Sequence, residues 1–297
     1  MINQLTDAEL REKIKQYAFY HQFRLTETIT TPCQPIVQPS LQSTLRALEG
    51  FDFHDKRVLD VGCRDGLFSF EAERRGAREV VGIDNDLSPA AVEFLAPFFR
   101  SQVRFSEMNL FDLAPATFGK FDVILFPGVL YHLRYPVWGL KRLQEVMNPR
   151  GTLLIETALI VDENEHALLY CPIGEESPYE PSSCTFFNVK GLSDTLLSLG
   201  FEVQSIHNQD EEVWRMYGQR SPPLESPQPG LRQRIRAVFF PPKPTAAPPK
   251  PSGMVIARSC FLCEFRPELI NPHLTMYWDG THQFHRTSPN VPGSEAA

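Results

Sequence analysis

The sequence predicts an α/β protein with a doubly wound, mainly parallel sheet, and three observations support this fold class. From residue 56 onward, short apolar runs alternate with segments of helical periodicity. The runs are continuously apolar, which is typical of strands that helices cover on both faces. The first run leads into a glycine-containing turn and the second ends in an acidic residue, both at the edge where such sheets bind ligands.

Six apolar runs are expected to be strands, and the segments between them are expected to be the covering helices. The expected strands are residues 57–61, 80–84, 103–108, 121–126, 152–157 and 201–206. A further run at 254–265 is expected to be the last strand. These units point to one domain over residues 51–265 rather than to two domains.

The segments around and within this domain have a different character. Residues 1–50 predict a helical extension, with Leu10, Ile14, Tyr17, Ala18 and His21 at helical spacing in 7–25 and a second helix in 40–50. Residues 221–251 contain ten of the 26 prolines, which predicts an extended insert before the last strand. A polar tail, 266–297, shows no clear period.

Composition and charge exclude several classes of protein. With 42% hydrophobic and 22% charged residues, the chain is neither disordered nor fibrous. We expect a cytoplasmic protein, because no run approaches the about 18 apolar residues of a membrane span and the polar N-terminus lacks a secretory signal. The net charge of −7 argues against a dedicated nucleic-acid binder. The basic cluster Arg232, Arg234 and Arg236 is interpreted as surface, with a contact to substrate phosphate as the alternative.

A cysteine pair offers a possible metal site. Cys260 and Cys263 form a C-x-x-C, with His282 and His285 about twenty residues later, as in some zinc sites. The surrounding residues predict a strand, however, in which positions three apart face opposite sides of the sheet. The His-x-x-His spacing is also shorter than usual. We therefore expect buried free thiols and no metal.

The turn after the first strand indicates the kind of ligand. Asp60 precedes a G-x-x-x-G formed by Gly62 and Gly66, whereas a dinucleotide-binding turn has G-x-G-x-x-G. An acidic residue there repels a pyrophosphate and suits a ligand with a positive amino group, which argues against a dehydrogenase. Asp84, about twenty residues later, is expected to accept hydrogen bonds from the ribose hydroxyls of an adenosine.

These motifs resemble a known family. Residues 60–66, the Asp84 strand end, and FDVI (121–124) before GVLYH (128–132) are similar to class I S-adenosylmethionine-dependent methyltransferases. More narrowly, GVLYHLRYP, LLIETALIVDENE and MVIAR resemble the tRNA wobble-uridine (carboxy)methyltransferase-like family. The resemblance covers about residues 50–265, and it implies a Rossmann-like seven-stranded sheet with S-adenosyl-L-methionine as cofactor.

The resemblance also implies a cofactor site, formed by residues that follow the first four strands. They are Asp60, Gly62, Gly66, Asp84, Asn85, Asn109, Leu110, Gly128, Leu130 and Tyr131. Those after the first strand are expected at the methionine part, those after the second at the ribose and those after the third at the adenine. Those after the fourth are expected at the methyl end. Arg64 replaces the usual middle glycine, so its side chain either strains the turn or stands over the pocket.

The substrate is less well indicated. Members of the family that transfer a carboxymethyl group to tRNA hold a negatively charged cofactor with basic and aromatic side chains. Tyr131 matches one of these, but Ser252 stands where the family has an arginine, and no counterpart of its lysine is found. An unpaired carboxylate in a closed pocket is costly, so unmodified S-adenosylmethionine is expected.

Catalysis is assigned to the ends of the fourth and fifth strands. His132 is a candidate general base, with a structural histidine as an equal alternative. Glu156 is expected to orient that base or bind substrate, and the alternative is a helix cap. The long connection at 166–188 supplies candidate acceptor-wall residues that fit a core role equally well: Tyr170, Tyr179, Phe186, Phe187 and Asn188.

The expected function is methyl transfer to a hydroxyl of a small molecule, such as a sugar or a secondary metabolite. A tRNA-modifying methyltransferase is the less favoured interpretation, because of the net charge of −7 and the missing arginine. A cofactor-binding scaffold without activity is a further alternative. The sequence predicts no oligomeric state.

Overall fold

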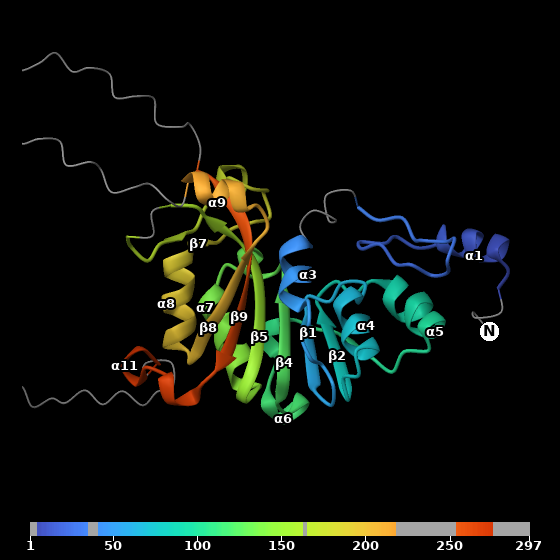
Figure 1. Cartoon of the computed structure of the whole chain (residues 1–297), viewed down its shortest axis with the longest axis horizontal. Coiled ribbons are helices and arrows are strands. Elements are labelled where there is room, and N and C mark those ends of the chain that lie inside the picture. Colours follow the sequence, from blue (N-terminus) through green and yellow to red (C-terminus); the bar gives the residue numbers. More distant parts are fainter. Residues whose placement is uncertain (1–4, 35–40, 163–164, 218–253, 276–297) are drawn as a thin grey trace, which may run out of the picture.

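The computed structural model describes residues 5–34, 41–162, 165–217 and 254–275 (Figure 1). Its centre is a sheet in which five parallel strands lie in the order β3-β2-β1-β4-β5. Their bounds are β1 (Arg57–Val61), β2 (Glu79–Asp84), β3 (Arg104–Glu107), β4 (Phe121–Pro127) and β5 (Met147–Ile160). All five runs predicted for this part of the sheet are strands.

The other half of the sheet contains the antiparallel pairs. β9 (Ile256–Phe265) runs antiparallel to β5 on one side and to β8 (Phe201–Asn208) on the other. Two short strands, β6 (Leu169–Tyr170) and β7 (Phe186–Asn188), bring the sheet to nine strands, where seven were predicted. Both belong to the long connection at 166–188. The prediction of a doubly wound, mainly parallel sheet is confirmed.

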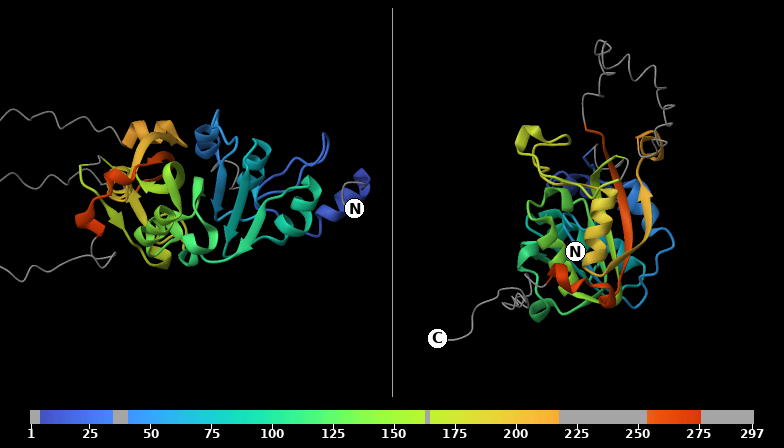
Figure 2. Two further views of the ribbon diagram at one scale, coloured as in Figure 1. Left: turned by 90° about the horizontal axis from the view of Figure 1, so that it is seen from below. Right: turned by 90° about the vertical axis from the view of Figure 1, so that its left-hand side faces the viewer.

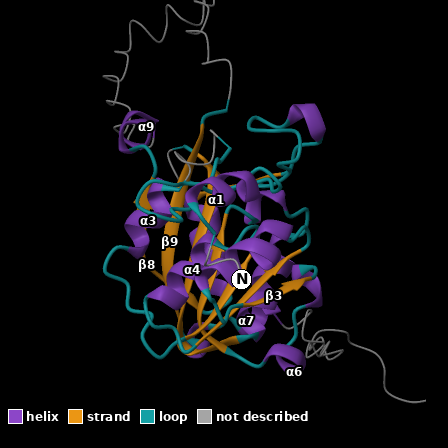
Figure 3. Ribbon diagram, turned by 90° about the vertical axis from the view of Figure 1, so that its right-hand side faces the viewer, coloured by secondary structure: helices purple, strands orange, loops and turns teal. Residues whose placement is uncertain are grey.

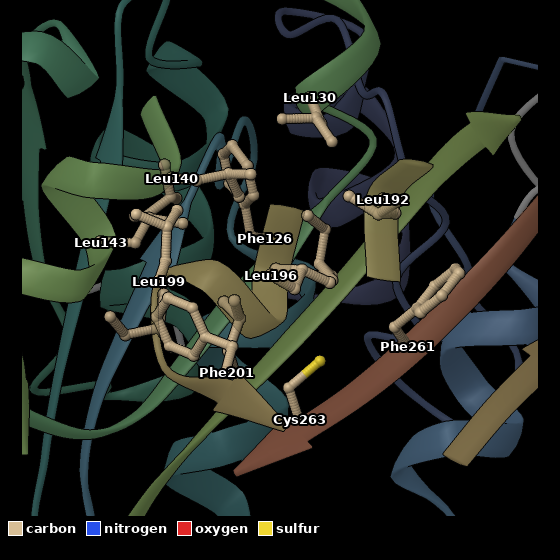
Figure 4. Close-up of a cluster of buried hydrophobic side chains, with 14 of the residues drawn as sticks. Phe126, Leu130, Leu140, Leu143, Leu192, Leu196, Leu199, Phe201, Phe261 and Cys263 are labelled. Atoms are coloured by element: carbon tan, nitrogen blue, oxygen red, sulfur yellow. The ribbon is translucent and has the colours of Figure 1, made fainter. Parts of the chain in front are cut away.

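Helices cover both faces of the sheet (Figure 3). Leucines of α7 (Pro136–Glu145) and α8 (Val189–Ser198) pack on one face, and α3 (Gln42–Leu48) and α4 (Leu67–Arg74) pack on the other. In Figure 4, side chains from α7 and α8 meet Phe126 of β4 and Phe261 of β9. Neighbouring residues of β1 divide between the two cores, Leu59 facing α7 and α8 and Val58 facing α3 and α4. This explains why the runs are apolar without alternation.

The remaining helices lie at the ends of the molecule or in connections. α1 (Asp7–Ile14) and α5 (Ala96–Phe99) lie at one end, and α9 (Glu211–Tyr217) and α11 (Pro272–Thr275) lie at the other (Figures 1 and 2). A π-helix (Ala90–Leu95) precedes α5, and α6 (Pro115–Phe118) connects β3 to β4. Within the described ranges, no helix has both the length and the apolar character needed to cross a membrane.

The prediction of one long helix over 7–25 is wrong beyond Ile14. Leu10 and Ile14 lie in α1 and are buried as expected. After α1 the chain takes up an irregular course, and the backbone N–H groups of Tyr20 and His21 donate to the Asp65 carboxylate. These tertiary hydrogen bonds take the place of the helical ones, so the spacing of apolar residues misled the prediction.

The expected divergence of Cys260 and Cys263 is confirmed. Cys260 lies in the core beneath α3 and α4, and Cys263 lies in the core beneath α7 and α8 (Figure 4). Both are free thiols. Several residues singled out in the sequence fall outside the described ranges: Arg232, Arg234, Arg236, Ser252, His282 and His285.

Candidate active site

A cavity of about 240 Å³ opens at the carboxyl ends of the parallel strands. Five of the residues predicted from sequence line it: Gly62, Asp84, Gly128, His132 and Glu156. The site therefore lies where a doubly wound sheet is expected to bind its ligand.

The turn after β1 requires its glycines. Gly62 has φ +74°, and a Cβ built on it would lie 2.3 Å from Cγ2 of Val129. Gly66 begins α4 at φ +84°, and a Cβ there would lie 2.7 Å from the Phe105 ring. Gly62 thus lets the backbone form the cavity wall, whereas Gly66 permits close packing of α4 behind it.

Arg64 replaces the usual middle glycine of the turn. It was expected either to strain the turn or to stand over the pocket, and the structure shows both features. Its φ of +51° is in the left-handed region, which is uncommon for a residue with a side chain. Its side chain lines the cavity and forms an ion pair with Asp86. Its backbone N–H donates to Oδ2 of Asp84 over 2.8 Å, which ties the turn to the end of β2.

Asp84 presents a carboxylate to the cavity with acceptor capacity to spare. Each oxygen accepts one backbone N–H at 2.8 Å, from Arg64 and from Asp86. A carboxylate offers about four lone-pair positions, so Asp84 can accept two further hydrogen bonds, the number that the two hydroxyls of a ribose would need. Asn85 beside it is exposed.

The residues expected near an adenine lie beside the cavity rather than in its wall. The N–H of Met108 donates to the Asp84 carbonyl over 2.8 Å, which brings the end of β3 next to Asp84. Asn109 caps a short 3₁₀ helix by accepting the N–H of Phe111, and Leu110 is in the core. Tyr131 and Leu130, after β4, are likewise buried.

Asp60 lies fully buried behind the glycine turn. Its Oδ2 accepts the Ser69 hydroxyl at 2.6 Å, while Oδ1 has no hydrogen-bond partner within the described residues. Burial raises the pKa of Asp60 to about 6. Asp60 is not part of the cavity wall, so its effect on a ligand's ammonium group is electrostatic rather than a direct contact.

This shifted pKa predicts a pH dependence of cofactor binding. Above pH 6 Asp60 carries a negative charge behind the turn, and below it the charge is lost. We expect the affinity for S-adenosylmethionine to fall by up to about tenfold between pH 7 and pH 5, since one pKa unit corresponds to about 1.4 kcal/mol. Isothermal titration calorimetry across this range measures the effect. The Asp60→Asn variant is the control, and an equal slope in this variant would show that another group is responsible.

The same shift affects stability in the absence of ligand. Burial disfavours the charged form of Asp60, and this raises its pKa in the folded state above the ordinary value of 3.8. The stabilising contribution of Asp60 is therefore complete below about pH 4 and is lost as the pH rises through about 6. Binding and stability thus depend on the charge of Asp60 in opposite directions.

His132 lines the cavity with one ring nitrogen engaged by the protein. Its Nδ1 lies 3.2 Å from the Ser182 carbonyl oxygen, which can only accept, so Nδ1 carries the proton. Nε2 is then the basic nitrogen, and it lies 3.5 Å from Oε1 of Glu180. A base held in one tautomer beside a carboxylate is suited to accept a proton.

Glu156 forms a buried ion pair with Arg258 of β9. The two carboxylate oxygens accept Nε and Nη2 of Arg258, both at 2.6 Å, and both residues line the cavity. Nη1 of Arg258 donates to the hydroxyls of Tyr131 and Tyr179, at 3.0 Å each. Burial opposes the charge of Arg258, but the attraction and hydrogen bonds of Glu156 raise its pKa well above the ordinary value.

The long connection after β5 is tied to the residues that follow β4. Nη1 of Arg134 donates to the carbonyls of Cys171, Pro172 and Cys184, at 3.0–3.3 Å. The Thr185 hydroxyl donates to the Leu133 carbonyl at 2.7 Å. This connection carries Tyr179, Glu180 and Ser182, and the ties hold these three residues beside the cavity.

The other candidate wall residues of this connection lie deeper. Phe186 packs with Tyr131 and Tyr170, and Phe187 joins the core under α8. Asn188 caps α8 by accepting the Gly191 N–H, and its amide group donates to Asp162 and His166. Among the five, Tyr179 is hydrogen-bonded to Arg258 of the cavity wall, and a role of all five in acceptor binding stays a prediction.

The cavity residues that sequence reasoning missed include Tyr20, His21, Thr44 and Arg258. Arg258 is the last residue of the MVIAR motif, but the arginine of the family was matched to Ser252 instead. Tyr20 and His21 stood in a segment interpreted as helix. The available signal was a histidine within an aromatic run, YAFYHQF.

The fold and the position of the cavity fit a class of enzymes whose cofactor contains a nucleoside. The family comparison identifies this class. Residues 36–206, more than half of the chain, match the family model described as a methyltransferase domain. The chain belongs to this family, the S-adenosylmethionine-dependent methyltransferases.

Two further comparisons show relatives. The chain is 34% identical over 153 residues to the tRNA U34 carboxymethyltransferase of Helicobacter pylori (strain G27), covering 50% of this chain and 57% of the relative. It is 36% identical over 115 residues to the enzyme of that name from Campylobacter fetus subsp. fetus, covering 38% and 40%. The chain thus spans about half the length of the curated relatives it matches.

Among solved structures, the N-terminal domain of EvdMO1 with SAH bound has a TM-score of 0.57 at 16% identity, covering 89% of this chain and 99% of that one. This similarity shows the fold.

Proposed function

We propose that this protein transfers the methyl group of S-adenosylmethionine to a hydroxyl of a small molecule, with His132 as general base. The observation that carries this proposal is that His132 lines the cavity while its Nδ1 lies 3.2 Å from the Ser182 carbonyl oxygen, an arrangement that leaves Nε2 to accept a proton. The acceptor class, a sugar or a secondary metabolite, fits the net charge of −7 and the half-buried Glu180 beside the cavity.

The residues of the cavity suit the cofactor. Asp84 accepts the ribose hydroxyls, and the turn at Gly62 lets the backbone approach the methionine part. Gly128, at φ +74°, opens the wall after β4 in the same way. When bound, the cofactor supplies a methyl group on a positively charged sulfur, which is a strong electrophile.

The chain's own groups then have one chemical task. The acceptor hydroxyl must lose its proton as it attacks, and Nε2 of His132 takes that proton. The imidazolium that forms lies 3.5 Å from Oε1 of Glu180, whose negative charge stabilises it. Glu180 itself is held by the Ser183 hydroxyl, which donates to Oε1 at 3.0 Å.

The Arg258–Glu156 pair favours the unmodified cofactor. Glu156 neutralises Arg258 with two hydrogen bonds at 2.6 Å, so the cavity wall offers no net positive charge at this point. A carboxylated cofactor would place a second carboxylate beside a cation that is already paired, and an uncompensated buried charge is costly.

The second candidate function is carboxymethyl transfer to tRNA, the activity named for the relatives. The observation that favours it is the contact of Arg258 with Tyr131, since a guanidinium and a phenol together can hold a carboxylate. For this function, Glu156 must give up one of its two hydrogen bonds to Arg258 when the cofactor binds.

A methyl-transfer assay separates these functions. The protein is incubated with S-adenosyl[methyl-¹⁴C]methionine, or with the carboxylated cofactor labelled at the same carbon, and either a panel of sugars and phenols or total bacterial tRNA. Label in a small-molecule acceptor supports the proposal, whereas label in tRNA overturns the acceptor class. Calorimetric binding of S-adenosylmethionine with no turnover of any acceptor points to the scaffold without activity.

The general base gives a sharper prediction. The His132→Asn variant is expected to lose about 10²–10³-fold in kcat, because the acceptor proton then has no base. Its affinity for S-adenosylhomocysteine is expected to stay within about twofold, since a change near 0.4 kcal/mol corresponds to that ratio. His207→Asn, on β8 outside the cavity, is the matched control. Wild-type kcat in His132→Asn would assign the histidine a structural role.

A further inference from the structure

We propose that Asp65 is a positioning residue for the cofactor, acting by locking the chain segment that covers the cavity. This segment, residues 15–34, is called the N-terminal strap. Tyr20 and His21 of the strap line the cavity, whereas Asp65 does not. The proposal concerns cofactor binding and holds for any acceptor.

The strap has little regular structure to fix its course. After α1 it contains one isolated bridge, between Arg24 and Thr30. On its outer side it packs against the π-helix and α4, with the Tyr17 ring stacked 5.5 Å from that of Phe94 and the Phe23 ring 6.1 Å from that of Phe70. Figure 1 shows this segment beside α4 and α5. Apolar packing thus holds one part of the strap, and the polar contacts of Tyr20 and His21 hold the part that lines the cavity.

Asp65 supplies these contacts. Its Oδ2 accepts the backbone N–H groups of Tyr20 and His21, both at 2.8 Å, and its Oδ1 contacts Nδ1 of the His21 ring. Asp65 is fully buried and His21 is 6% exposed. Within the described residues, the hydrogen-bond partners of this carboxylate belong to the strap, so displacement of the strap would leave a buried carboxylate without its donors.

The contacts join two parts of the cavity wall that are distant in the sequence. Asp65 directly follows Cys63 and Arg64, which line the cavity, and it accepts hydrogen bonds from Tyr20 and His21, which line it as well. Tyr20 also lines a second cavity, of about 230 Å³. Its ring packs against the core beneath α3 and α4 and against the His21 ring, and the hydrogen bonds to Asp65 fix the backbone that carries it.

The consequence is an effect on cofactor affinity transmitted through the strap. Asp65→Ala is expected to raise the dissociation constant for S-adenosylhomocysteine about tenfold, as losing bonds to a buried charge costs about 1.5–3 kcal/mol. Asp65→Asn keeps one acceptor oxygen for the two N–H groups, so an intermediate value is expected. Asp194→Ala, an exposed carboxylate on α8, is the matched control and is expected to bind like the wild type.

Two measurements on the full chain test the proposal. The first is calorimetry with S-adenosylhomocysteine on variants whose thermal unfolding shows a folded protein. Wild-type affinity in folded Asp65→Ala would overturn the proposal. The second applies even where Asp65→Ala does not fold, and it compares amide hydrogen exchange of peptides from 15–34 in the wild type and Asp65→Asn. Slow exchange in the wild type without cofactor and faster exchange in the variant support a locked strap. Equal exchange in the two proteins excludes it.

Discussion

Replacing Asp84 with alanine is expected to raise the dissociation constant for S-adenosylmethionine about 100-fold. The carboxylate is placed to accept two ribose hydroxyls, and hydrogen bonds to a charged group are worth about 1.5–3 kcal/mol each. A loss of about 2.8 kcal/mol corresponds to the 100-fold change. The substitution also frees the Arg64 N–H from its acceptor, which loosens the turn at the other wall of the cavity.

Calorimetry of both S-adenosylmethionine and S-adenosylhomocysteine measures this effect. Asp194→Ala is the matched control, because Asp194 is an exposed carboxylate on α8 that does not line this cavity. Near-wild-type binding by Asp84→Ala would show that the ribose lies elsewhere, and the assignment of the end of β2 would have to be abandoned.

The second large effect is expected at the buried ion pair. Glu156→Gln removes the charge that compensates Arg258, whose side chain is 10% exposed, while keeping the shape of the site. Removing one partner of a buried pair destabilises a protein by about 3–5 kcal/mol, since the other charge stays buried. The free energy of unfolding from urea titration is expected to fall by this amount.

A double variant separates the charge from the packing. Combining Glu156→Gln with Arg258→Met removes both charges, and most of the lost stability is expected to return. The exposed pair Lys190–Asp194 on α8 is the control, for which about 0.2–1 kcal/mol is expected. If Glu156→Gln is as stable as the wild type, the pair makes no net contribution to the free energy of unfolding, and the protein tolerates the unpaired charge of Arg258.

The sequence was sufficient for the sheet and for one half of the site. Its apolar runs were readable because strands such as β1 and β4 are buried on both faces, so local composition reveals them. Gly62 and Asp84 were found because the chain must turn at the end of β1 and because the acidic residue of β2 stands at a fixed distance from that turn.

The other half of the site depends on contacts between distant positions. Asp65 and His21 are 44 residues apart, and Glu156 and Arg258 are 102 residues apart. No periodicity connects such pairs, and the helical spacing in 7–25 pointed the other way. Phe186 and Phe187 were ambiguous for a related reason, since a short strand inside a long connection leaves too few residues for a pattern.

Cys260 and Cys263 can report the order in which the two helical layers leave the sheet during unfolding. Burial raises the pKa of both thiols, so neither forms the reactive thiolate while the sheet is covered. One sulfur lies under α3 and α4 and the other under α7 and α8, although both belong to one strand. Alkylation of Cys260 ahead of Cys263 would therefore mean that the first helical layer detaches before the second, and simultaneous alkylation would mean that the domain unfolds as a unit.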